Sequence, residues 1–521
     1  MCRGKMKLDS FFFIVALLIG SCLVRAWNSD VERTKINEAK LWQRNTHQMA
    51  SVEINKAAIG GVLAPLLSYK FLLPMPQLRA GLAYAGSRAR LRRFVRDLVH
   101  GNKPLKIGAL GGSITWGQGA SNQTTTSWFG VVTDWLATAF PSINITARNG
   151  AVPATPASFM IMCLDHFVDP DVDLVFVEYI LNNGLEDRIF ENQVVREMER
   201  LIRKLLDLPG KPAVVMMQVP SDGMASYGSG LRFHHTMEDL EGALAQYYDV
   251  QYLSLRTALY RLAAIDQEDG FRWDQIFVDH HPGDAGHRVM ADLVIYMLQD
   301  TALDLLLDPW SYKEQRAEQE KPLQGPMYSG NTAPSAAMCL YGDLFAPAVV
   351  PSKTHGFVYV NEGSIQKPRW RYVATQPGSR LVMRVDTRRP HLPPDHRVSL
   401  YLHYLKSYEH MGVANLSCTS GCECSTTEVD GHVTELWSQM YQVRLVASQS
   451  GSCEVTLTVL PRTSSGDYEF KVSGAIISED QSAADMLDGT ADGEGRLYWD
   501  FEDPSKDGGG GGDRTTTAAM T

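Results

Sequence analysis

The sequence predicts an α/β domain built on a parallel sheet, followed by an all-β domain. The first observation is that continuous apolar runs of strand length alternate with amphipathic runs of helix length between residues 106 and 299. A strand of a parallel sheet is covered on both faces, so it appears as an unbroken apolar run. The second observation is a change beyond residue 335 to short alternating runs separated by turn residues, which is typical of a β-sandwich.

The predicted elements follow in order along the chain. In the α/β part we expect strands at residues 106–110, 143–147, 174–178, 213–219 and 251–254, with helices at 128–140, 189–208 and 288–299. In the all-β part we expect strands at 380–385, 397–405, 441–447 and 453–459. Residues 28–100 carry helix-like stretches interrupted by prolines, with no convincing strand.

A chain of 521 residues is too long for one ordinary hydrophobic core, and these patterns divide it into six segments. We expect a signal peptide at 1–26, a helical N-terminal arm at 27–103, the α/β domain at 104–307, a linker at 308–335, a disulfide-containing β-sandwich-like domain at 336–477, and a disordered acidic and glycine-rich tail at 478–521.

The charge balance argues against a nucleic-acid partner. The formal net charge is −10 and no long basic stretch occurs, whereas phosphate binding requires clustered Lys and Arg. Five arginines between residues 88 and 96 are the exception, and they alternate with apolar residues. We interpret this stretch as an amphipathic helix with a solvated basic face, and a polyanion contact is the alternative.

The first 26 residues have the pattern of a cleaved secretory signal. Three basic residues precede the apolar run 11–20, and Val24-Arg25-Ala26 offers small residues at the positions that a signal peptidase reads. The run is shorter than the roughly 20 residues that a membrane span needs, and no second apolar segment of that length follows. We therefore expect a secreted protein without a stable membrane span. An uncleaved signal anchor that keeps the chain in the secretory-pathway lumen is the alternative.

The cysteines and glycosylation sequons support export. Six cysteines follow Ala26, and four of them crowd the distal region: Cys418, Cys422, Cys424 and Cys453. In an oxidising compartment we expect these four to form disulfides, with a zinc-thiolate site as the alternative. Cys163 and Cys339 either bridge the two domains or remain buried thiols. Acceptor triplets begin at Asn122, Asn144 and Asn415.

A serine lies where the first predicted parallel strand gives way to a loop. The sequence Gly111-Gly112-Ser113-Ile114-Thr115 follows the apolar run 106–110 directly. Glycines let the backbone turn closely, and a following helix offers free N–H groups to a developing oxyanion. An ordinary turn is the alternative, while a phosphate loop is disfavoured because no Gly-Lys-Ser/Thr follows.

Three further polar blocks follow in order, each near the end of a predicted strand or before a helix. They are Asn149-Gly150-Ala151, Asn182-Asn183 and Asp279-His280-His281-Pro282. A Ser, a Gly, an Asn and a His in this order resemble the SGNH (GDSL-like) hydrolases, over roughly residues 104–299. The resemblance implies a flavodoxin-like three-layer α/β/α domain. With the distal segment 404–412 and its cysteines, the chain is similar to secreted members that carry an added C-terminal domain.

The resemblance also assigns roles to residues. Ser113 would be the nucleophile and His281 the base, while the N–H groups of Ser113 and Gly150 and the Asn182 side chain would bind the oxyanion. Gly150 could instead only permit a turn, and Asn182 could only cap a loop. The sequence departs from the family pattern at Ile180 and Asn183. It also has Val278 three residues before His281, where the family has its acid, so Asp279 is the nearest substitute.

The implied activity is a secreted serine esterase that needs no cofactor. Its substrate would be an ester, with acyl groups on a polysaccharide or glycoprotein as the first candidate. A metal site at His280, His281 and His287 is a minor alternative. Two other functions remain open: a glycan O-acyltransferase of the secretory pathway, and a catalytically weak carbohydrate-binding or matrix protein on a hydrolase fold.

Overall fold

The structure is a computed structural model, and it describes residues 64, 66, 68–101, 103–183, 189–219, 237–264, 273–278, 281–311, 313–314, 316, 322–363, 368–389, 391–434 and 438–479. The expected signal peptide, most of the N-terminal arm and nearly all of the C-terminal tail lie outside these residues, as do Asp279 and His280. Among the described helices, none is both long enough and apolar enough to cross a membrane.

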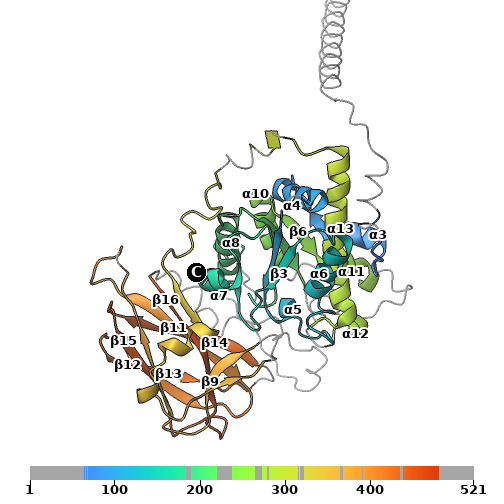
Figure 1. Ribbon diagram of the computed structural model, residues 1–521. Helices are drawn as coiled ribbons and strands as arrows, with labels where there is room; N and C mark the ends of the chain where they lie inside the picture. Colours follow the sequence, from blue (N-terminus) through green and yellow to red (C-terminus); the bar gives the residue numbers. More distant parts are fainter. Residues whose placement is uncertain are drawn as a thin grey trace, which may run out of the picture. The chain divides into compact units, whose positions relative to one another are not determined.

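The α/β domain contains a six-stranded sheet in the order β1-β6-β5-β4-β2-β3 (Figure 1). Five strands are parallel: β2 (Leu105–Gly111), β3 (Ile145–Asn149), β4 (Leu174–Glu178), β5 (Ala213–Gln218) and β6 (Gln251–Ser254). Their order confirms the predicted flavodoxin-like arrangement, in which the chain reverses direction across the sheet between β2 and β4. Ligands of such sheets bind outside the carboxyl ends of the strands at this switch point.

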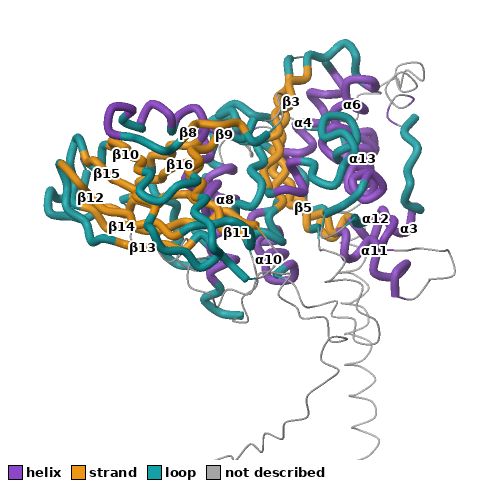
Figure 2. Tube along the Cα trace, turned by 90° about the horizontal axis from the view of Figure 1, so that it is seen from below, coloured by secondary structure: helices purple, strands orange, loops and turns teal. Residues whose placement is uncertain are grey.

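Helices cover both faces of the sheet, as predicted (Figures 1 and 2). On one face α13 (Asp284–Leu307) contacts α4 (Ala89–His100) and α6 (Trp128–Ala139). On the other, α8 (Gln193–Leu206) contacts α7 (Ala157–Phe167) and α10 (Glu238–Tyr248). Every residue of β4 and β5 is therefore buried, which explains their continuous apolar sequence. The sequence analysis did not predict α7 and α10.

The described residues between 68 and 101 belong to this domain. After α3 (Met75–Gly81), the short strand β1 (Leu82–Tyr84) pairs antiparallel with β6, although no strand was expected here. The expected solvated basic face of the following helix is also wrong. Arg92 of α4 is only 3% exposed and forms ion pairs with Asp304, at the end of α13, and with Glu314. Arg90 donates to the carbonyl oxygens of Leu206 and Pro212. These arginines fix the helix to the domain.

The C-terminal domain consists of two antiparallel sheets around a common core, as predicted. One sheet has the order β10-β15-β12-β13 and the other β14-β11-β16-β9-β8, with β7 beside β16. The first sheet comprises β10 (Arg380–Val385), β15 (Cys453–Val459), β12 (Val413–Ser420) and β13 (Thr427–Asp430). The second comprises β14 (Ser438–Ala447), β11 (Val398–Ser407), β16 (Phe470–Ser478), β9 (Trp370–Ala374), β8 (Val358–Asn361) and β7 (Met338–Tyr341).

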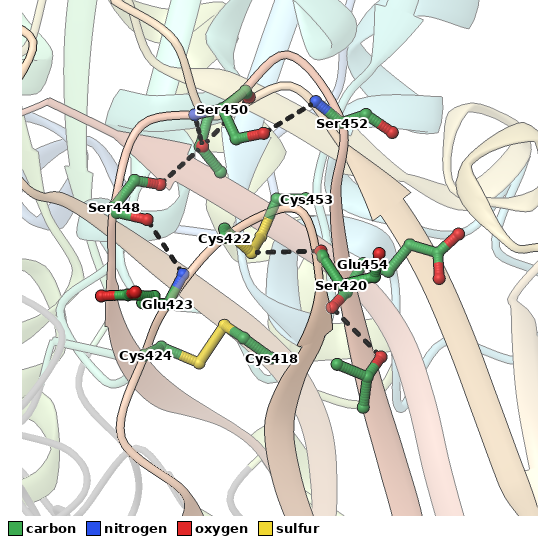
Figure 3. The surroundings of a disulfide bond; sticks show 12 residues. Cys418, Ser420, Cys422, Glu423, Cys424, Ser448, Ser450, Ser452, Cys453 and Glu454 are labelled. Atoms are coloured by element: carbon green, nitrogen blue, oxygen red, sulfur yellow. Dashed lines mark hydrogen bonds between the residues drawn. A yellow bond between two sulfur atoms is a disulfide. The ribbon is translucent and has the colours of Figure 1, made fainter.

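Six cysteines form three disulfides. In the distal domain Cys418 pairs with Cys424, and Cys422 pairs with Cys453 (Figure 3). The expectation of distal disulfides is thus confirmed, and the sulfur atoms are bonded to each other rather than arranged as four thiolate ligands. Cys163 of α7 is joined to Cys339 of β7, so this bond links the two domains covalently.

The two domains also share a hydrophobic core. Tyr401 and Ile476 of the sandwich belong to the same cluster of buried residues as helices α7 and α8. Phe159 of α7 packs edge-on against the His403 ring, with centroids 4.8 Å apart. Burial lowers the pKa of His403 to about 3, so this ring is neutral at physiological pH and suits an apolar interface.

Part of the expected linker packs against the shared core. Leu323, Met327 and Tyr328 lie against the shared core, and Asn331 is fully buried. The Asn331 side chain accepts from Arg200 Nε at 2.6 Å and donates to Glu199 Oε2 at 2.6 Å. Because both partners are buried, this amide holds the segment to α8.

We expect Asn331→Ala to destabilise the protein by about 3 kcal/mol, because it leaves a buried guanidinium and a buried carboxylate without their amide partner. The shift of the urea unfolding midpoint measures this effect. Thr332→Ala removes the exposed side chain next to it and should change stability by less than about 0.5 kcal/mol. Equal shifts in the two variants would contradict the structural role of this amide.

Candidate active site

Ser113 begins a single helical turn at the carboxyl end of β2, the strand between β4 and the edge strand β3. That strand ends at Gly111, and α5 (Ser113–Trp116) follows after Gly112. A Cβ at residue 112 would lie 1.9 Å from Asn182 Oδ1, so any larger residue there would displace the Asn182 side chain. This close approach places the Asn182 side chain next to the start of α5. The switch point between β2 and β4 therefore carries the predicted serine.

The structure brings Ser113 and His281 together. Ser113 Oγ lies 2.7 Å from His281 Nε2, within hydrogen-bonding distance. His281 is 3% exposed, whereas Ser113 is partly exposed and accessible to a substrate. Phe277 pairs antiparallel with Pro282, and the Val278 N–H donates to the carbonyl oxygen of His281. The residues on either side of Asp279 and His280 therefore run antiparallel, while these two residues lie outside the described ranges.

Asn182 is the second predicted residue that the structure places beside Ser113. It is 6% exposed and follows β4, the strand next to β2. The neighbouring Asn183, which stands where the family has an aspartate, accepts from the Ala157 N–H at 2.9 Å through Oδ1 and donates to Glu241 through Nδ2. An asparagine can thus accept at this position, as a carboxylate would, and it also anchors the loop that carries Asn182.

Gly150 does not offer a free donor. Its N–H donates to the carbonyl oxygen of Ala109 at 2.9 Å, which continues the pairing of β2 with β3. A Cβ at residue 150 would lie 2.2 Å from the Phe167 carbonyl oxygen, so glycine is required there by close packing. In the loop that follows, Ala154 has a φ of 61°, in the left-handed region that a residue with a Cβ rarely adopts.

Two residues, Asn149 and Glu178, support the Ser113 turn. The sequence analysis did not assign them this role. Asn149 Nδ2 donates to the Thr115 carbonyl oxygen at 2.7 Å, which ties the Gly150 loop to α5. The Thr115 hydroxyl donates to Glu178 Oε2 at 2.9 Å. A polar residue that ends a buried apolar strand, as Glu178 does, is the sequence signal that could have identified such a support.

Three buried carboxyl groups lie beneath this edge of the sheet. Burial raises the pKa of Glu178, Glu238 and Glu241 to about 7 each, and hydrogen bonds from neighbouring side chains offset part of the effect. Repulsion from Glu238 and Glu178 adds to the raised pKa of Glu241. These acids therefore titrate near neutral pH, which is unusual for carboxyl groups.

Of the other histidines of the motif, His280 lies outside the described residues and His287 lies in α13. His287 is fully buried in α13, and its Nε2 lies 3.1 Å from the Gln118 carbonyl oxygen, as a structural residue would. Among the described residues, the only grouping of potential metal ligands comprises Cys418, Cys422 and Cys453, whose sulfur atoms are in disulfides.

A residue of the β domain reaches the same turn. The Arg369 guanidinium, just before β9, lies over the Trp116 ring at 4.8 Å from its centroid. Trp116 is three residues beyond Ser113, so the two side chains lie on the same side of the helical turn. The sequence analysis did not predict this contact, because it assigned no strands between residues 336 and 379.

Comparisons with known proteins agree with this geometry. Residues 109–289 match the family model of the GDSL-like Lipase/Acylhydrolase family. A search of curated proteins gave no match. Among solved structures, the chain is similar to a two-domain esterase active on acetylated mannans, with 21% identity, a TM-score of 0.56, and coverage of 77% of this chain and 99% of that one.

Two further structures are similar. The mannan esterase co-crystallised with mannopentaose gives a TM-score of 0.54 at 21% identity, over 79% of this chain and 99% of that one. An acetyl xylan esterase variant from Geobacillus stearothermophilus gives 0.30 at 16% identity, over 38% and 95%. The two-domain likeness shows that both folds and their order along the chain recur in another protein. Residues 109–289 are therefore a GDSL-like lipase/acylhydrolase domain, and the chain is an ester-hydrolysing enzyme.

Proposed function

We propose that this protein is a secreted esterase that removes acyl groups, acetyl above all, from carbohydrate, with Ser113 as the nucleophile. The observation that carries the proposal is the 2.7 Å contact between Ser113 Oγ and His281 Nε2. A neutral imidazole at this distance takes the serine proton as the oxygen attacks the ester carbonyl, and later returns it to the leaving alcohol. Water then hydrolyses the acyl-enzyme by the same route.

The oxyanion donors are proposed from the positions beside Ser113. The Ser113 N–H and the Asn182 side-chain amide supply two of them, because Asn182 lies against Gly112 at the start of the turn. The Gly150 N–H is engaged with Ala109, so we assign the third donor to the loop that follows Gly150. Ala154 is preferred there, since backbone strain is concentrated at functional sites.

Asp279 remains the proposed third member of the catalytic group. It would hold the imidazole in the tautomer that accepts the serine proton and would stabilise the imidazolium that forms. Without such a carboxylate, Ser113 and His281 would act as a dyad.

Several features support the proposed substrate and compartment. The two-domain esterase with the same domain order acts on acetylated mannans, which makes acylated polysaccharide the first substrate class to test. Three disulfides suit an oxidising compartment. The sequon residues Asn122 and Asn144 are exposed, as glycan attachment requires. The basic and apolar N-terminus is the proposed signal peptide.

We expect Ser113→Ala to abolish the release of acetate from acetylated mannan and from aryl acetates. The remaining rate should lie near that supplied by the oxyanion donors alone. Ser142→Ala, which changes an exposed serine of the same domain, should retain full activity. Acetate release and fluorophosphonate labelling measure the effect, and full activity in Ser113→Ala would place the nucleophile elsewhere.

Asp279→Asn tests the third member of the catalytic group. If the carboxylate orients His281, kcat should fall by up to about 10⁴-fold while the melting temperature stays close to that of the wild type. A change of less than about tenfold would reduce the group to a Ser–His dyad.

The buried Glu178 should make stability depend on pH. Its pKa is raised to about 7 in the folded protein, against 4.5 for an unperturbed glutamate. Between these pH values only the folded chain keeps the proton, so the free energy of unfolding falls as pH rises through this window. The contribution of this group is on the order of 3 kcal/mol, and it is fully present below pH 4.5.

Glu178→Gln should remove this contribution. The stability of the variant minus that of the wild type should be greater at pH 8 than at pH 5. Thermal unfolding of both proteins across this range measures this difference. The exposed Glu409→Gln serves as the control and should shift the melting temperature equally at both pH values. The same uniform shift in Glu178→Gln would show that Glu178 is not held neutral by burial.

A further inference from the structure

Three cations of the sandwich lie on one face of neighbouring strands. Arg369 and Arg371 alternate with Trp370 and therefore project to the same side of β9, and Lys471 lies on the adjacent strand β16. Arg371 forms an ion pair with Glu362 at 2.7 Å, and Lys471 forms ion pairs with Glu362 at 2.8 Å and Glu469 at 3.4 Å. The two acidic residues thus compensate Arg371 and Lys471.

Arg369 is different from these two neighbours. Within the described ranges, no carboxylate lies within ion-pair distance of its guanidinium, and its Nε is buried without a hydrogen-bond partner. Burial, together with repulsion from Arg371, lowers its pKa, although an arginine stays charged. A partly buried and unpaired charge is costly, and an anion that binds beside it would offset this cost.

Arg369 lies close to the helical turn that carries the proposed nucleophile. Its guanidinium covers the Trp116 ring, and Trp116 is one helical turn from the nucleophile Ser113. Stacking on a ring occupies one face of the guanidinium plane and leaves the N–H groups at its edge available, which is the geometry that binds carboxylate or sulfate in a bidentate manner.

We propose that Arg369 binds an anionic group of the acylated glycan, a uronate carboxylate or a sulfate, and so makes the enzyme selective for acidic polysaccharide esters. This inference rests on the proposed function and deepens it. One cation without a carboxylate within ion-pair distance among the described residues, stacked one helical turn from Ser113, matches a single charged sugar near the scissile ester. It does not match a nucleic acid, which needs a row of cations. The β domain would then contribute directly to substrate choice.

Binding of unacylated oligosaccharides tests the proposal without any chemistry. The purified full-length protein is titrated calorimetrically with trigalacturonate for the carboxylate, a sulfated galacto-oligosaccharide for the sulfate, and neutral mannopentaose. At least one anionic ligand should bind about tenfold or more tightly than mannopentaose, and added salt should weaken that preference. The ligand that shows the preference identifies the anion. Equal or weaker binding of both anionic ligands, or no binding of any ligand, overturns the proposal.

Variants then assign the preference to this side chain. Arg369→Gln should abolish the tenfold preference, while Arg369→Lys should retain part of it, because a lysine keeps the charge but not the planar fork. Arg380→Gln, which changes an exposed arginine of the other sheet, should bind all three ligands as the wild type does. A preference that survives in Arg369→Gln contradicts the assignment.

Measurements of turnover distinguish the proposed anion selectivity of Arg369 from the proposed esterase function on which it rests. The ratio of kcat/KM for acetylated galacturonate oligomers to that for acetylated mannan oligomers should fall about tenfold or more in Arg369→Gln. If the wild type releases no acetate from any ester, the proposed function fails, and the binding result alone decides the role of Arg369. If turnover occurs with an unchanged ratio, the esterase proposal stands and the anion selectivity fails.

Discussion

The contact between the Asn182 amide and the Cα of Gly112 is the constraint on which the site depends. It leaves no space for a Cβ at residue 112 while Asn182 keeps its position, and it places the Asn182 side chain next to the turn that begins with Ser113. Asn183 and Glu241 hold one side of this arrangement, while Asn149 and Glu178 hold Thr115 on the other. Among the described residues, buried polar side chains therefore hold the Ser113 turn in place.

Much of the fold could be predicted because burial on two faces leaves a clear mark on a strand. The apolar runs of β4 and β5 and the alternating runs of β10 and β15 were found within about one residue. The helix α7 was not found, because it lies between the sheet and the β domain and is apolar on nearly all sides, so its sequence lacks the helical period. The role of Arg92 was missed because Asp304 lies 212 residues away.

The candidate site shows a similar limit. The resemblance to the SGNH hydrolases implied the pairing of Ser113 with His281 and a place for Asn182 near the serine, and the structure brings these residues together. The resemblance was not enough to assign backbone donors. Whether an N–H such as that of Gly150 is free depends on its pairing with Ala109, and pairing is a property of the folded sheet.

The joint between the two domains has a consequence for how such a protein changes over evolution. Tyr401 and Ile476 belong to the same buried cluster as residues of the α/β domain, and the bond between Cys163 and Cys339 joins the same surfaces. Transferring the α/β domain alone into another gene would expose the apolar surface that the β domain covers and would leave Cys163 without its disulfide partner. Selection should therefore keep the two domains together as one unit, and substitutions on one side of their interface should be compensated by substitutions on the other.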